Sequence, residues 1–153
     1  MLARSTCYLW RYYDWHTEIL FRTLKSGCRV EERLFEHIDR LLPCVAVYLI
    51  VAWRTLYVCR LGRSCPDLSC EAVFEPCEWK SVYRVVTRQA PPATPPRLAA
   101  MVRLIAQLGG YVNRKRLDPP GPQTVWLGLQ RMHDLALAWQ TFGPGATMEQ
   151  ELV

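Results

Sequence analysis

The chain has 153 residues, of which 50% are hydrophobic and 22% are charged, and its formal net charge is +5. This is about the length of one ordinary domain, and the chain is too apolar to be disordered. The moderate basic excess suits a polyanionic partner such as DNA without requiring one.

The first helix is predicted near the N-terminus, because apolar residues recur at helical spacing from Trp15 to Leu24 and the run stops at Ser26-Gly27. A second helix is predicted from about residue 31 to residue 60, with Pro43 as the place for a kink. It is expected to end at Leu61-Gly62.

The most apolar part of this second helix is LLPCVAVYLIVAW, residues 41–53. A membrane-spanning helix needs about 20 apolar residues, and this segment is shorter. We therefore interpret it as a buried core helix, with a membrane span as the alternative.

Two short helices are predicted next, over residues 67–74 and 76–87, because Pro66 and Pro76 suit the first turn of a helix. The segment APPATPP, residues 90–96, cannot hold a helix and is predicted to be a stiff, extended connector.

An amphipathic helix follows the connector, with apolar positions from Leu98 to Leu108 and a stop at Gly109-Gly110. The last helix is predicted over residues 123–142 and carries a wide apolar stripe that needs a partner surface. Because no segment has the alternation of a strand, we predict an all-α chain of about six helices.

The seven cysteines are scattered, and no two have the Cys-x-x-Cys spacing of a zinc or redox motif. With no signal peptide, unpaired cysteines predict a reducing cytoplasmic location. A zinc site made of Cys65, Cys70 and Cys77 with a histidine is the less favoured alternative, because the gaps do not match the usual ligand pairs.

The stretch W-x-x-E-x-x-F-R-x-L-K-S-G-C-R-V-E, residues 15–31, closely resembles one segment of bacterial DDE transposases of the insertion-sequence-four, Tn-five-like family. In that family the segment carries the last catalytic acid. LSCEAVFEPCEWKSVYRV (68–85), LIAQLGGYVNRKR (104–116) and TVWLGLQRMHDLALAWQTF (124–142) are similar to the family's C-terminal dimerisation region, in the same order.

The resemblance implies a role for three residues of the first stretch. Glu18 corresponds to the last acid of the triad, Lys25 to the lysine of the family's Y-x-x-R-x-x-x-E-x-x-x-x-x-x-K signature, and Arg22 to a basic residue near the transposon end. On an α-helix these three side chains share one face. The signature's tyrosine and arginine are replaced here by Arg11 and Asp14, so their DNA contacts do not carry over.

Catalysis in the intact family needs two Mg or Mn ions held by several carboxylates. The family's other two aspartates lie upstream, on a ribonuclease-H-like sheet for which this chain has no matching region. We expect Glu18 to bind metal only if partner acids are supplied, so the chain alone should have no cofactor and no activity. Without them, a surface carboxylate paired with Arg22 is favoured.

The resemblance also implies a domain organisation and a function. Residues 1–62 would be a remnant of the catalytic domain, residues 63–145 a dimerisation domain and residues 146–153 a tail. We expect a truncated transposase fragment that dimerises and binds transposon ends. The alternative is a stand-alone helical interaction module that inhibits intact transposase through mixed dimers, and neither reading involves a membrane.

Two further groups of residues are candidates for these contacts. DNA backbone contact and simple solvent exposure are equally favoured for Arg114, Lys115 and Arg116. Residues 97–142 hold six basic residues against two aspartates, and this excess slightly favours a surface that faces DNA. Dimer contact and intrachain core are equally favoured for a set on the last helix. This set is Trp126, Leu129, Met132, Leu135 and Trp139.

Overall fold

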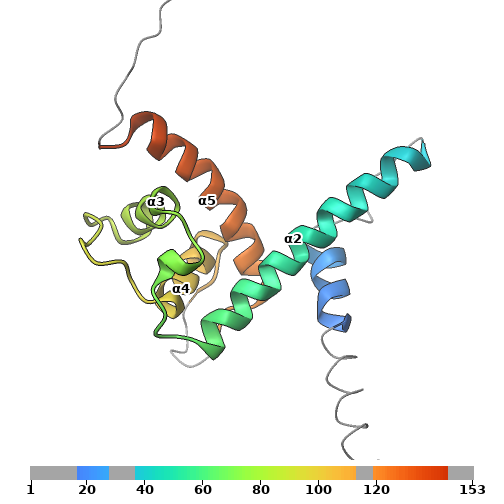
Figure 1. Ribbon diagram of the computed structural model, residues 1–153, viewed down its shortest axis with the longest axis horizontal. Helices are drawn as coiled ribbons and strands as arrows, with labels where there is room; N and C mark the ends of the chain where they lie inside the picture. The colour runs from blue at the N-terminus through green and yellow to red at the C-terminus, as the bar shows by residue number, and fades with distance from the viewer. Residues whose placement is uncertain (1–16, 28–36, 113–118, 145–153) are drawn as a thin grey trace, which may run out of the picture. The chain divides into compact units, whose positions relative to one another are not determined.

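The computed structural model describes residues 17–27, 37–112 and 119–144. The chain divides into two compact units, Met1–Tyr57 and Val58–Val153. The described residues form helices and no strand, with one isolated β-bridge between Ser69 and Arg97 (Figure 1). The all-α prediction is therefore confirmed for this part of the chain.

The helical elements follow one another with short connections. Residues 17–22 are helical and continue directly into a π-helix, η1 (Thr23–Gly27). The remaining elements are α2 (Ile38–Ser64), the 3₁₀ turn η3 (Cys70–Ala72), α3 (Pro76–Thr87), α4 (Leu98–Leu108) and α5 (Pro122–Phe142).

Three of these helices have the bounds that their sequence signals predict. Helix α3 begins at Pro76 and ends at Thr87, α4 ends at Gly109-Gly110, and α5 begins one residue before the predicted start. A capping box fixes the start of α3, where the Glu78 side chain accepts a hydrogen bond from the Glu75 N–H at 2.9 Å. The connector 90–96 is non-helical, as predicted.

The helix predicted over residues 67–74 is wrong, because only the turn η3 forms there. Backbone groups of this segment pair with the end of the proline connector instead. The Cys70 N–H donates to the Pro96 carbonyl at 3.0 Å, and the Leu98 N–H donates to the Leu68 carbonyl at 2.7 Å. These long-range bonds hold the segment in an extended form that a helix would prevent.

Both predicted ends of the second helix also need correction. α2 starts at Ile38, because His37 is not helical, and residues 31–36 of the predicted helix lie outside the described residues. At the other end the helix passes through Gly62 to Ser64. Gly62 packs closely against α4 instead of ending the helix. A Cβ there would lie 3.1 Å from the Val102 side chain.

The prediction that residues 41–53 form a buried core helix is wrong within the described structure. Leu42, Val47, Ile50 and Trp53 are 59–66% exposed. Apolar residues occur on all sides of α2, so one neighbouring element cannot cover them. By length and composition α2 could cross a membrane, a test that the core helix of a soluble protein also passes, and only 17% of its most apolar window is buried.

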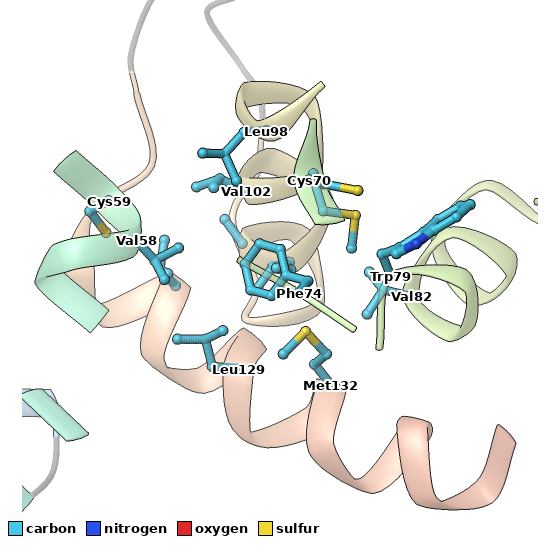
Figure 2. Close-up of a cluster of buried hydrophobic side chains, with 14 residues drawn as sticks. Val58, Cys59, Cys70, Phe74, Trp79, Val82, Leu98, Val102, Leu129 and Met132 are labelled. Atoms are coloured by element: carbon cyan, nitrogen blue, oxygen red, sulfur yellow. The ribbon is translucent and has the colours of Figure 1, made fainter. Parts of the chain in front are cut away.

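The hydrophobic core of the second unit lies between α3, α4 and α5, which pack against one another. Figure 2 shows Leu129 and Met132 pointing from α5 toward Phe74, with Leu98 and Val102 of α4 on another side of that ring. The partner surface needed by the apolar stripe of α5 is thus supplied by the chain itself.

Two glycines allow the backbones of α4 and α5 to approach closely. A Cβ at Gly128 would lie 2.6 Å from the carbonyl carbon of Ile105, and a Cβ at Gly109 would lie 2.8 Å from that of Thr124. Both distances are far inside van der Waals contact, and backbone atoms cannot move aside as a flexible side chain can. The crossing therefore requires glycine at both positions.

We predict that Gly128→Ala lowers the free energy of unfolding by about 1–3 kcal/mol or more, because the added methyl group overpacks the helix crossing. Gly121→Ala is the matched control, since a Cβ at Gly121 meets no atom within 4 Å. Because Gly121 is the N-cap of α5, this change should cost no more than about 1 kcal/mol. Urea unfolding followed by circular dichroism measures both. Equal stability of Gly128→Ala and wild type would contradict the close crossing.

Candidate functional site

The predicted catalytic segment lies on the surface of the first unit. Glu18 and Arg22 are exposed and stand one turn apart on the helical residues 17–22. Lys25 is also exposed, but it lies in the π-helix η1, where hydrogen bonds join residues five apart. The shared-face argument assumes an α-helical period, which residues 17–22 have, whereas Lys25 follows the π-helical period.

The residues described here do not fit the metal centre that the transposase resemblance implies. A pair of divalent ions needs several converging carboxylates. Within residues 17–27, 37–112 and 119–144, no three His, Cys, Asp or Glu side chains gather into a possible metal site. We therefore assign no chemical step to Glu18, and within the same residues Cys65, Cys70 and Cys77 form no zinc site.

The five predicted dimer residues of α5 divide into two groups. Leu129 and Met132 are 9% and 2% exposed and belong to the chain's own core, while Trp126, Leu135 and Trp139 are half-buried. The assignment of these five residues to a dimer contact stays a prediction. Only Trp126, Leu135 and Trp139 are partly accessible to a second chain.

The outward side of α5 carries apolar residues that the sequence prediction missed. Leu127, Leu137 and Phe142 are 37%, 52% and 82% exposed. The helical period could have found them as a second apolar group, but it could not tell which side of the helix faces the core.

The predicted DNA-binding residues Arg114, Lys115 and Arg116 lie outside the described residues. Two other arginines, Arg63 and Arg103, border a hollow of about 270 Å³ in the second unit. Sequence reasoning did not single out this pair, since the hollow combines three segments that are distant along the chain. Its lining is Cys59, Gly62, Arg63, Pro66, Ala99, Val102, Arg103, Pro119 and Pro120.

Two cysteines are held as neutral thiols by their surroundings. Burial raises the pKa of Cys59 to about 11, against the opposing effect of the nearby Arg63 guanidinium. Burial, followed by the Glu71 carboxylate, raises the pKa of Cys70 to about 11. Both side chains belong to the hydrophobic core.

The family model described as the transposase Tn5 dimerisation domain matches residues 50–139, which is more than half of the chain and includes η3, α3 and α4 in full. No curated protein and no solved structure matches the chain.

We predict that adding magnesium or manganese chloride leaves the melting temperature of the chain unchanged, because Glu18 has no described partner acids. An ion that bound only the folded state would raise it. Differential scanning fluorimetry of wild type and Glu18→Gln makes the measurement. A rise in wild type that Glu18→Gln abolishes would show that a metal site exists.

Thiol alkylation of the native chain at pH 8 should label the exposed Cys65 well before Cys59 and Cys70. The reacting species is the thiolate, and a pKa raised from 9.0 to about 11 leaves about a hundredfold less of it. Peptide mass spectrometry with and without denaturant gives the order of labelling. Labelling of Cys59 as fast as Cys65 without denaturant would be inconsistent with this core.

Proposed function

The chain belongs to the family of the transposase Tn5 dimerisation domain, and on this premise we propose that it is the C-terminal region of an insertion-sequence-four DDE transposase. Its role is to bring two transposon ends together by self-association. The match over residues 50–139 is the observation that carries this proposal.

The second partner in the proposal is the DNA of the transposon end. A net charge of +5 favours association with a polyanion. Arg22 and Lys25 are exposed, and we assign them, with Arg114, Lys115 and Arg116, to the DNA backbone. DNA recombination of this kind takes place in the cytoplasm of a bacterium.

Strand cleavage and joining are proposed only for the assembled transposase. Glu18 is the descendant of the last acid of the triad, and it acts with Mg or Mn only where another chain or segment supplies two further carboxylates. The resemblance of residues 15–31 to the family's segment with the last acid supports this role.

The surface proposed for self-association is the outward side of α5, and its occupant is a second copy of the same helix. Leu127 and Leu137 project from this side, away from the core residues Leu129 and Met132. In a twofold symmetric pair each subunit offers the same patch to the other. Burying two leucines from each subunit supplies an apolar centre for such a contact.

We predict a monomer–dimer equilibrium in sedimentation velocity over a range of protein concentrations. Leu137→Asp should weaken it about tenfold or more, because a charge would be buried in the contact. Val85→Asp is the matched control, since Val85 is also apolar and 49% exposed but lies on α3. These sites suit the test better than the half-buried Trp139, where a new charge would also disturb the fold.

A wild type that stays monomeric at every concentration would overturn the dimerisation proposal. If Leu137→Asp dimerises as wild type does, the interface lies elsewhere than on α5. Self-association with no affinity for DNA would instead favour an interaction module that forms mixed dimers with intact transposase.

A further inference from the structure

The hollow between the end of α2 and α4 has the features of an anion site. Two arginines border it, and the described residues of its lining include no aspartate or glutamate. Of the carboxylates that adjoin a lining residue in the sequence, Asp67 is already paired with Arg97 at 2.8 Å, and Asp118 lies outside the described residues. The positive charge at the hollow is therefore not neutralised by its described neighbours.

One of the two arginines is oriented by the backbone. The Arg63 guanidinium donates a hydrogen bond from Nη2 to the Pro120 carbonyl at 3.2 Å, which ties the end of α2 to the residues just before α5. A guanidinium has five N–H donors, so this bond leaves others for a ligand. Fixing the side chain in advance lowers the entropy lost on binding.

The remaining walls are apolar and uncharged. The lining includes Ala99 and Val102 of α4 and the prolines Pro66, Pro119 and Pro120. Cys59 also lines it, and because its pKa is raised to about 11 the thiol adds no negative charge at neutral pH. A low-polarity wall strengthens the attraction between a guanidinium and an anion.

The volume limits the size of the ligand. At about 270 Å³ the hollow lies below the range of about 300–1,000 Å³ usual for drug-sized ligands. It suits one charged group with its immediate attachment, and the planar fork of a guanidinium is suited to binding a phosphate.

We propose that Arg63 and Arg103 hold one backbone phosphate of DNA in this hollow. The proposal deepens the function proposed above, since it rests on DNA being a partner, and it adds a contact surface to the candidate basic residues of the sequence. The contact is to phosphate alone, so it contributes affinity and position but no sequence readout.

The test is fluorescence anisotropy of the full chain with a short labelled duplex at several salt concentrations. Arg103→Gln and Arg63→Gln should each weaken binding about tenfold and reduce the slope of log affinity against log salt by about 1. Arg84→Gln is the matched control, because it removes the same charge from an exposed position on α3 outside the hollow. Circular dichroism checks that each variant is folded.

A second variant tests the hollow without changing the charge. Ala99→Leu places a larger side chain in the cavity while both arginines remain, and it should weaken duplex binding to a similar degree. This separates a phosphate held in the hollow from a general effect of net charge.

The outcomes distinguish failure of the phosphate site from failure of the proposed DNA binding. If the three hollow variants bind the duplex as tightly as wild type, the phosphate site is wrong and DNA binding by other residues survives. If wild type binds no duplex, the phosphate site and the DNA part of the proposed function both fail, whereas dimerisation is judged by sedimentation. Stabilisation by inorganic phosphate that Arg103→Gln abolishes, without duplex binding, would assign the hollow to a small phosphate ligand and overturn the DNA assignment.

Discussion

The second unit depends on the close backbone approach of α4 and α5, which Gly109 and Gly128 make possible. Because the two helices meet without intervening side chains, the apolar residues on either side of the crossing can interlock with α3 in one core. The close contact with α5 also determines the position of the opposite side of α4. That side carries Ala99 and Arg103, which form one wall of the arginine-lined hollow. The helix crossing thus positions both the core and the candidate phosphate site.

Local signals were sufficient to predict α3, α4 and α5, because each begins or ends at a proline or glycine whose effect is confined to a few residues. Segment 67–74 could not be predicted in this way. Its conformation depends on hydrogen bonds to residues 96–99, and nothing within the segment indicates these partners. The helix end predicted at Gly62 was wrong for a related reason. Glycine can end a helix or allow close packing, and its packing role here is evident only from the neighbouring Val102.

The candidate sites show a similar limit. The apolar stripe of α5 was visible in the sequence, but periodicity cannot say whether a stripe faces the same chain or another, and Leu129 and Met132 face the same chain. Glu18 could be found only through family resemblance, because a single carboxylate on a helix is common. The hollow could not be predicted from the sequence for a third reason. Arg63, Arg103 and Pro120 come from three separate segments, and their proximity exists only in the folded chain.

The pairing between residues 66–70 and the end of the proline connector has a consequence for how the second unit is held together. The backbone bonds at Pro96, Leu98 and Ala99 attach the start of α4 to the segment before α3 without help from the connector's middle. A single peptide-bond cut within residues 91–95 would therefore leave two fragments joined by a shared core and these bonds. Their reassembly after separation would become a bimolecular reaction, with a rate proportional to fragment concentration. The connector is thus a covalent tether whose contribution is effective concentration rather than structure.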